Sequence, residues 1–582
     1  MNRTEQILLA LSVITGLCAI FWGSLEELLL SSAWVQTCPY LSQPSGNQHH
    51  RFVRYKNGIV LTGNPDDPVV EEFVVDQQQG VFVLENVTDA SMMMDIDLGG
   101  ALVTPGLVDP HVHFLSGGLF LESLNVGHVR DRDGLAHEVE KAVQAKERGG
   151  WVVGYMYHGE FGHARWIDGV SPDTPVVIYR FDSHQMLVNS VALRLASIDA
   201  STPEPSGGEI VRDENGRPTG VLCDAAMTLV TRVIPKVTEA ELMRAFERAQ
   251  QYAFSKGVTH VHDMGRVGFV DGEYAAFEDV QNIYREVVKA GELKIRMNAF
   301  VSLNALPAIL DMVNVLGRRE DRLSFGSVKG FYDGSLSSRT ALMYEPYKDD
   351  GSRGVRAVNV SDFVALVSMA KSAGVAVATH AIGSRAVDEV IDAYEKFGGN
   401  GLRIEHAQHV SGIESIKKLA KLGIGVTPNP LHWVGDRDII PTRLHEKDSK
   451  YSYPLKEFVR YGVNVGLASD WPVVDMDPME TLEAAIDSKN PYALSFSEAF
   501  WCITRGAALL GDPNARFGAI QDGMFADFVI HASTADVQKA VYATLDIPND
   551  SHVSSERLKD AIARRQAVEK TFVQGQCVYG CS

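Results

Sequence analysis

Two histidines one residue apart, His111 and His113, end an apolar run that begins near residue 101. Side chains alternate along an extended segment, so both imidazoles point to the same side and can reach one metal ion. Neutral imidazole nitrogens are good ligands for zinc and related divalent ions. Pairs of this kind also occur by chance in surface turns, so the weight of the motif depends on the rest of the chain.

Four further residues of suitable chemistry stand in or directly after other apolar segments: Lys329, His380, His406 and Asp470. Imidazole and carboxylate bind zinc, whereas a lysine ammonium does not because it is cationic. A buried lysine loses its charge more easily, and its reaction with carbon dioxide would give an anionic carbamate that can bridge two metals. Two metals about 4 Å apart can activate one water, and a carboxylate such as Asp470 can take its proton.

The middle of the chain alternates between strand-like and helix-like segments, which is typical of βαβ units and a parallel sheet. Helices are expected at 239–256, 361–373 and 411–422. Eight strands are expected at 101–109, 259–263, 295–302, 326–331, 375–380, 402–406, 424–427 and 463–468. We therefore predict an α/β fold, a (β/α)₈ TIM barrel over residues 101–514, whose strand ends gather the six candidate ligands at one mouth.

Two parts of the chain depart from this alternation. Residues 114–250 are expected to carry an insertion, because two extra strand-like runs at 151–157 and 175–181 lie there. Short strand-like segments with Gly, Asn and Asp turns fill residues 51–100, and similar segments recur in 515–582. They predict a small composite β-sandwich domain built from both ends of the chain.

The N-terminal region differs in composition from the body. Residues 7–25 are apolar and uncharged, and a span of about 20 such residues crosses a bilayer. Residues 1–25 are therefore expected to be a single-pass membrane anchor of the secretory pathway or endoplasmic reticulum, or a signal peptide whose cleavage leaves a secreted protein. Residues 26–50 resemble a linker. Glycosylation triplets that would fit a lumenal body occur at Asn86, Asn359 and Asn549.

Composition excludes several classes of function. The 582 residues are 45% hydrophobic, enough for a large core, and the net charge of -20 is spread without a basic stripe, so no nucleic acid is expected as a partner. The six cysteines include no C-x-x-C pair and form no zinc ribbon, although Cys577 and Cys581 are near enough in sequence to pair. A homodimer is allowed by the sequence.

A set of motifs in a fixed order gives the chain a family resemblance over about residues 50–580. They are Pro105-Gly106-Leu107-Val108-Asp109-Pro110-His111-Val112-His113, Lys329 with Asp333-Gly334-Ser335-Leu336, His380-Ala381-Ile382-Gly383, Arg403-Ile404-Glu405-His406-Ala407-Gln408, Ser469-Asp470-Trp471-Pro472 and Gly523-Met524-Phe525-Ala526-Asp527-Phe528. With them the sequence resembles the amidohydrolase superfamily, and within it the amidohydrolase-3 (YtcJ-like) family of metal-dependent hydrolases.

The resemblance implies hydrolysis of a non-peptide C–N bond, in a small-molecule substrate of the N-substituted amide or formamide type. It assigns His111, His113 and Asp470 to a more buried metal, and His380 and His406 to a second metal. It implies that Lys329 bridges the two as a carbamate, that the cofactor is two Zn²⁺ per chain, and that Asp470 and Lys329 act in catalysis. In the insertion, His184 would contact the substrate or polarise its carbonyl, and a structural hydrogen bond is the equal alternative for it.

Two motifs depart from the family pattern. Ser384 stands where the family has aspartate, and the family's Gln-Pro-x-His is replaced by a stretch from Thr427 to His432. Neither change removes a ligand, but both affect substrate choice. His260 and His262 are interpreted as core or supporting residues. Two alternatives stay open: a catalytically reduced regulatory protein on this fold, which needs none of the six ligands, and a deaminase or isomerase, which often needs no lysine.

Overall fold

The computed structural model describes residues 50–581, with gaps at 66–67, 84–91, 147–148, 181–184, 206–207, 267–273, 317–318, 321 and 532–567. The predicted anchor at 1–25, the linker before residue 50, His184, Asn86 and Asn549 lie outside the described residues. Within the described part, no helix is long and apolar enough to cross a membrane.

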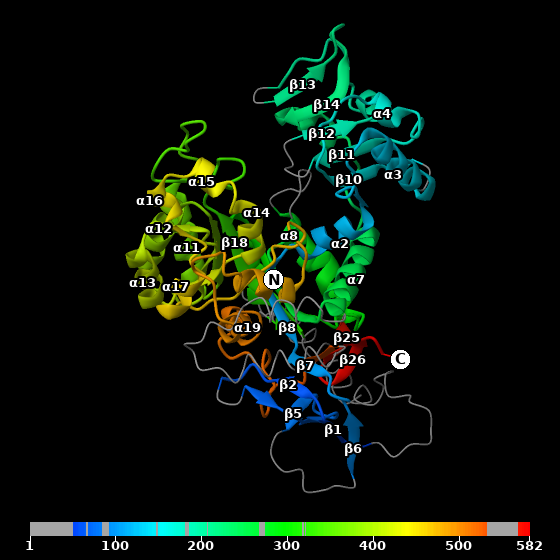
Figure 1. Ribbon diagram of the computed structural model, residues 1–582. Helices are drawn as coiled ribbons and strands as arrows, with labels where there is room; N and C mark the ends of the chain where they lie inside the picture. Colours follow the sequence, from blue (N-terminus) through cyan, green and yellow to red (C-terminus); the bar gives the residue numbers. More distant parts are fainter. Residues whose placement is uncertain are drawn as a thin grey trace, which may run out of the picture. The chain divides into compact units, whose positions relative to one another are not determined.

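Seven parallel strands form the wall of a barrel (Figure 1). In their order around the wall they are β8 (Leu107–Val112), β15 (Val258–Asp263), β16 (Arg296–Ser302), β18 (Leu323–Phe331), β19 (Ala376–Ala381), β20 (Leu402–His406) and β22 (Gly425–Thr427). A short strand, β17 (Arg319–Glu320), pairs antiparallel with β18. Most of these strand residues are buried, as expected for a parallel sheet covered on both faces.

An extended segment closes the barrel between β22 and β8. Val426 donates its backbone N–H to Asn464 O at 2.9 Å, and on the other side Asp470 donates to His111 O at 2.9 Å. Bridges join Val426 to Val465 and Val112 to Trp471, both parallel. The segment thus occupies the eighth position around the wall, and the predicted (β/α)₈ TIM barrel is confirmed.

The helices around the barrel follow from their sequence periodicity. In α7 (Glu239–Ser255) the buried residues are Leu242, Ala245, Phe246, Ala249, Gln250, Ala253 and Phe254, which lie on one face. Thr238 and Glu241 form a capping box at its start. The other two predicted helices are α11 (Val360–Ser372) and α13 (Ile413–Leu422), and α12 (Ser384–Glu395) lies between them in the chain.

Two sheets from both ends of the chain form the predicted β-sandwich. One contains β1 (Phe52–Lys56), β4 (Phe73–Asp76), β5 (Val81–Val83) and β6 (Met93–Asp97); the other contains β2 (Ile59–Leu61), β3 (Val69–Val70), β7 (Leu102–Pro105), β24 (Phe528–His531), β25 (Val568–Val573) and β26 (Gln576–Tyr579). Antiparallel pairing of β7 with β24 joins the two ends of the chain. A stacked pair of rings, Phe528 and Phe572, lies in the core of the sandwich with centroids 4.3 Å apart.

The strand predicted at 101–109 is divided in the structure. Its first half, β7, belongs to the sandwich, and its second half, β8, is the first strand of the barrel. Gly106 stands between them, and a Cβ there would lie 2.2 Å from Thr259 Oγ1. The chain passes so close to β15 at this point that only glycine fits without a shift of its neighbour.

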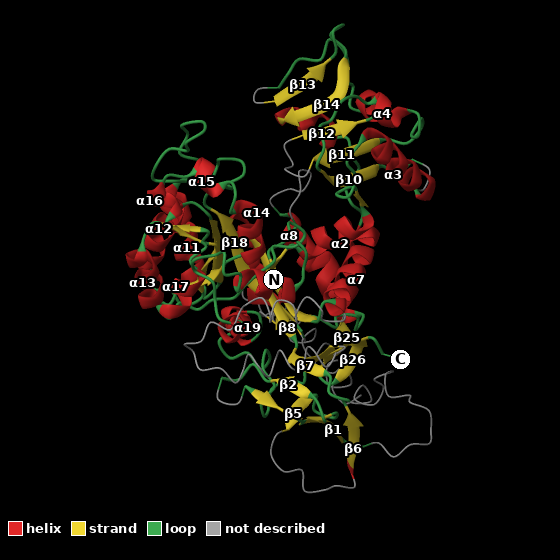
Figure 2. Ribbon diagram, viewed as in Figure 1, coloured by secondary structure: helices red, strands yellow, loops and turns green. Residues whose placement is uncertain are grey.

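The insertion forms a sheet of its own (Figure 2). Its order is β13 (Gly208–Arg212), β14 (Pro218–Asp224), β12 (Gln185–Val188), β11 (Val176–Arg180), β10 (Val152–Tyr157) and β9 (Leu124–Asn125). It carries α3 (Arg132–Ala145), α4 (Arg165–Asp168) and α5 (Ser190–Leu195), with separate hydrophobic clusters. The insertion starts later than residue 114, since α2 (Phe114–Glu122) is a barrel helix that packs on α7.

Candidate metal centre

The six predicted ligands come together at the carboxyl ends of the barrel strands. His111 and His113 end β8, Lys329 lies in β18, His380 in β19, His406 ends β20, and Asp470 lies in the closing segment. All are buried except His380, whose side chain retains 13% exposure. This is the face on which barrels of this type carry their chemistry.

Asp470 lies at the centre of the cluster. Its Oδ1 is 3.2 Å from His111 Nε2 and 3.2 Å from His113 Nε2, yet it is buried and accepts no hydrogen bond from the described residues. One ligand atom each from His111, His406 and Asp470 lie within 4.8 Å of one another. A buried carboxylate oxygen without a donor is costly, and a cation held between it and the imidazoles would satisfy it.

The other two predicted ligands contact this group. Lys329 Nζ lies 3.4 Å from His111 Nε2, and the His380 ring lies with its centroid 4.5 Å from that of His406. The six residues are therefore one contiguous set. The three residues close enough to share one ion are His111, His406 and Asp470. His111 was predicted for one ion and His406 for the other, so the division of the histidines between two ions stays a prediction.

The hydrogen bonds of the β8 histidines fix which nitrogen faces the cluster. His111 Nδ1 donates to Glu405 Oε2 at 2.5 Å, and His113 Nδ1 donates to Gly265 O at 2.7 Å. A carboxylate and a carbonyl oxygen only accept, so the proton must lie on Nδ1 in both rings. Each Nε2 then presents a lone pair toward Asp470.

The remaining two histidines are oriented in the same way. His406 Nδ1 donates to Asn429 Oδ1 at 2.7 Å, and Asn429 in turn donates its Nδ2 to Ala468 O at 3.2 Å, which fixes the amide orientation. His380 Nε2 donates to Gly334 O at 3.1 Å. All four imidazoles thus have one nitrogen held by an acceptor and one free for a metal, which is how metal-binding histidines are supported. The donor set fits a divalent ion.

The backbone at two ligands lies in the left-handed region. His406 has φ of 71° and Asp470 has φ of 65°. A non-glycine residue pays for such a conformation, and it persists where surrounding contacts hold it, often at functional sites. Here the Asp470 N–H donates to His111 O. Ala407, which directly follows His406, donates its N–H to Ala381 O at 3.1 Å. These hydrogen bonds hold the backbone of the two ligand residues in place.

Burial keeps two histidines of the cluster, His380 and His406, neutral. Burial lowers the pKa of His380 to about 3, with the nearby Lys329 acting in the same direction, and it lowers the pKa of His406 well below the ordinary value. Burial also lowers the pKa of Lys329 to about 8, although Glu405 and Asp470 oppose this. At neutral pH these two imidazoles therefore carry lone pairs, and an appreciable share of Lys329 is a free amine.

A buried ion pair between Arg403 and Glu405 supports His111, because Glu405 accepts its hydrogen bond. Burial alone would raise the pKa of Glu405, but Arg403 and His111 more than offset it and hold that pKa at about 2. Arg403 Nε lies 2.7 Å from Glu405 Oε1, and Arg403 Nη1 donates to His262 Nδ1 at 2.8 Å. His262 is thus a supporting residue, because it contacts Arg403 and is not itself one of the candidate ligands. In the sequence Glu405 stands only as one member of a motif, and nothing there indicates its bond to His111.

Of the two positions that depart from the family pattern, one contacts a candidate ligand and the other does not. Ser384 Oγ donates to Asp448, away from the ligands. Asn429 holds His406, as described above, so the changed stretch supports a ligand directly. Beside it, α14 (Pro430–Asp436) carries His432, whose Nε2 lies 3.9 Å from Asp470 Oδ2.

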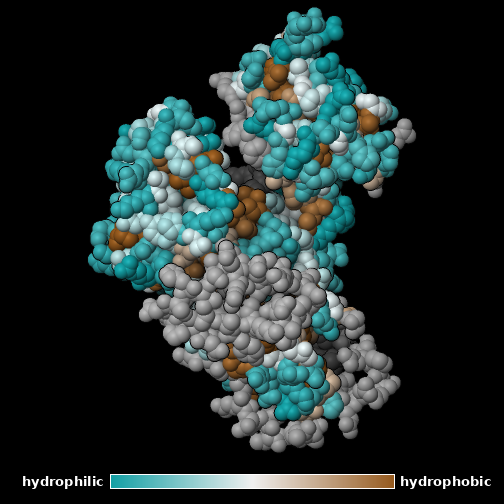
Figure 3. Space-filling model, in the orientation of Figure 1, coloured by the Kyte–Doolittle hydropathy of each residue, from teal (hydrophilic) through white to brown (hydrophobic). Residues whose placement is uncertain are grey.

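Apolar side chains are exposed near the ligands. Phe331, the last residue of β18, is 48% exposed, and its ring centroid lies 5.3 Å from that of His380. Val434 of α14 and Val473, three residues after Asp470, are also exposed. In Figure 3, hydrophobic surface gathers where Figure 1 labels α14, while most of the visible face is hydrophilic.

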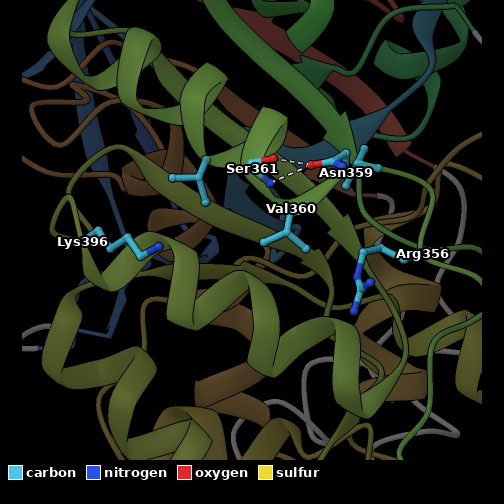
Figure 4. Close-up of a pocket in the computed structure, with 7 residues that line it drawn as sticks. Arg356, Asn359, Val360, Ser361 and Lys396 are labelled. Atoms are coloured by element: carbon cyan, nitrogen blue, oxygen red, sulfur yellow. Dashed lines mark hydrogen bonds between the residues drawn. The ribbon is translucent and has the colours of Figure 1, made fainter.

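A hollow of about 760 Å³ lies elsewhere, at the start of α11. Figure 4 shows that Arg356, Asn359, Val360, Ser361 and Lys396 line it, with Asn359 Oδ1 accepting hydrogen bonds from Ser361. Arg356 is paired with Glu389 at 2.7 Å. None of the six candidate ligands contributes to its lining.

A parallel barrel with a buried His, His and Asp group at the strand ends has the fold and the donor set of a metal-dependent hydrolase. The comparison with known families agrees, because the amidohydrolase family matches residues 96–579. The chain therefore belongs to the amidohydrolase family.

Individual relatives agree with this assignment. Protein LONG AFTER FAR-RED 3 of Arabidopsis thaliana is 32% identical over 549 residues, which cover 89% of this chain and 94% of the relative. N-substituted formamide deformylase of Arthrobacter pascens is 26% identical over 469 residues, 75% of this chain and 84% of the relative. Among solved structures, an uncharacterized metal-dependent hydrolase from Pyrococcus furiosus is 27% identical with a TM-score of 0.68, over 82% of this chain and 98% of that one.

Proposed function

We propose that the protein hydrolyses a non-peptide C–N bond in a small N-substituted amide or formamide, with a water activated by divalent metal. The observation that carries the proposal is the orientation of the four histidines. Each has one nitrogen tied to an acceptor and the other left for a metal, and in His111 and His113 that second nitrogen lies 3.2 Å from Asp470 Oδ1. A regulatory scaffold has no need of this arrangement, so the intact ligand set favours the enzyme over the regulatory alternative.

We propose two Zn²⁺ per chain. His111, His113 and Asp470 would hold one ion, and His380 and His406 the other. When bound, the ions lower the pKa of a water and polarise the substrate carbonyl. The geometry supports one shared centre, because the two sets of residues touch through His111 and His406, whose ring centroids are 4.9 Å apart.

Lys329 would bridge the two ions as a carbamate. Its neutral amine attacks carbon dioxide, a bond forms between Nζ and carbon, and one amine proton leaves to solvent. Burial lowers the pKa of the amine to about 8, which supplies the nucleophilic form, and the contact with His111 Nε2 at 3.4 Å places the product beside a ligand. Deaminases of this fold often manage without such a lysine, so Lys329 favours amide hydrolysis over deamination.

Asp470 would move the proton. A carboxylate that holds a divalent ion is ionised, so Asp470 would be ready to accept a proton. It would take a proton from the attacking water as the C–O bond forms and deliver it to the leaving nitrogen as the C–N bond then breaks. His184 remains a proposed substrate contact.

The substrate class is supported from two sides. One relative is named for deformylation of N-substituted formamides. In this chain the exposed Phe331 ring beside His380 offers an apolar wall to a substituent on the nitrogen.

We also propose that the body resides in the secretory pathway, membrane-anchored or secreted, since Cys577 and Cys581 form a disulfide. A homodimer remains part of the proposal.

The test is an activity screen of the full-length, metal-loaded protein against N-alkyl and N-aryl formamides and acetamides. Chromogenic anilides such as 4-nitroformanilide release 4-nitroaniline and give a direct readout. We expect turnover that a chelator abolishes and added Zn²⁺ restores, and that His113→Ala loses. No turnover of any member by protein that holds two metals would contradict the proposal.

A further inference from the structure

One polar group beside the cluster is left without a partner. His432 Nε2 is buried and makes no hydrogen bond with the described residues. It lies 3.9 Å from Asp470 Oδ2, too far for a direct hydrogen bond. The ring is stacked on that of His406, with an angle of 15° and centroids 6.1 Å apart. The group therefore lies at the edge of the space that the ligands surround.

The hydrogen bond at the other nitrogen determines where the proton is. Gln408 Nε2 donates to His432 Nδ1 at 3.3 Å, so the neutral ring carries its proton on Nε2. The amide of Gln408 turns its NH₂ group to the ring, and an amide NH₂ group only donates, so Nδ1 is the acceptor and Nε2 carries the proton.

A protonated nitrogen does not bind a metal, so His432 differs from the four ligand histidines. In each of those four rings the nitrogen without a hydrogen bond is bare, whereas the corresponding nitrogen of His432 is a donor. A buried donor without an acceptor costs about 1–3 kcal/mol, and an acceptor supplied by a bound molecule removes that cost. Because the donor faces Asp470, which moves the proton, the acceptor is at the reacting end of the substrate.

We propose that His432 is a catalytic residue whose Nε2–H donates a hydrogen bond to the carbonyl oxygen of the scissile amide. This rests on the proposed function. The bond strengthens as negative charge develops on that oxygen during attack by water, so it stabilises the transition state more than the bound substrate. The proton stays on His432 throughout; Asp470 alone carries a proton from water to the leaving nitrogen.

Two substitutions separate this role from a structural one. In His432→Gln the amide Nε2 reaches about as far as the imidazole Nε2, so a donor remains. In His432→Asn the amide reaches only the Nδ1 position, so the contact with Gln408 can persist while the inward donor is lost. We expect His432→Asn to lower kcat by roughly 10²–10³-fold with a smaller change in KM, as for removal of one donor to an oxyanion.

Under the same conditions His432→Gln should stay within about tenfold of the unchanged protein, and both variants should hold the same amount of metal. The substrate is the anilide or amide that the unchanged protein turns over fastest. Equal kcat losses in the two variants, full activity in His432→Asn, or loss of metal from it would overturn the role of His432. An unchanged protein that holds metal but turns over nothing would overturn the proposed function and this inference with it.

Discussion

Glu405 offers the sharpest test of how the fold supports the metal centre. It is fully buried, accepts from His111 Nδ1 and Thr427 Oγ1 at 2.5 Å each, and pairs with Arg403. Glu405→Gln keeps the shape and removes the charge. It leaves Arg403 buried without its counter-ion, which costs about 3–5 kcal/mol, and weakens the hold on His111, which should lower metal affinity about 10–100-fold.

The lowered pKa of Glu405 sets the pH range in which the first effect acts. The pKa of Glu405 falls from 4.5 to about 2 in the folded protein, which corresponds to roughly 3 kcal/mol. Because the folded pKa is the lower one, this stabilisation is present above pH 4.5 and is lost as the pH falls toward 2. The gap in unfolding free energy between the unchanged protein and Glu405→Gln should therefore narrow below pH 4.5.

A matched control exists in a second buried ion pair. Arg296 Nε contacts Asp527 Oδ2 at 2.6 Å, and both side chains are buried, but neither touches the candidate ligands. Asp527→Asn should destabilise the metal-free protein by a similar amount and leave metal affinity unchanged. Denaturant unfolding of metal-free protein and competition with a chelating indicator measure the two quantities. Equal metal affinity in Glu405→Gln and Asp527→Asn would refute the role assigned to Glu405.

The remaining predictions concern Lys329 and the close approach of two strands. With a pKa of about 8, roughly one tenth of Lys329 is neutral at pH 7 and half at pH 8. Uptake of ¹³C-labelled carbon dioxide by metal-free protein, followed by NMR, should therefore increase as the pH rises from 7 to 8 and should be absent in Lys329→Met; a carbamate signal that persists in the variant would contradict this. Gly106→Ala should cost about 1–3 kcal/mol of unfolding free energy, because its Cβ would lie 2.2 Å from Thr259 Oγ1, whereas Gly169→Ala, with no atom within 4 Å of the new Cβ, should be tolerated. Equal stability of the two glycine variants would show that the strand contact is not tight.

Much of the barrel and its ligand set could be predicted from the chain alone. His111, Lys329, His406 and Asp470 each end or lie in an apolar segment, and a parallel barrel has to bring such strand ends together. The sandwich could also be predicted, because short strands with alternating apolar residues occur at both chain ends. Such strands bury their apolar face only by packing against a second sheet.

Other features depend on contacts that sequence spacing does not encode. The division of the segment around Gly106 arises because β24, more than 400 residues away, pairs with its first half. The bond between Glu405 and His111 joins residues on two different strands, so neither motif contains it. His432 was visible in sequence only as a departure from a motif, and its role depends on the orientation of Gln408.

Metal content tests the central claim most directly. Purified full-length protein should contain two divalent ions per chain by elemental analysis, and His111→Ala should lose metal and activity together, because His111 contacts Asp470 and Lys329 and lies beside His406. Protein that contains no metal, together with a His111→Ala variant identical to it in metal content and activity, would contradict the account.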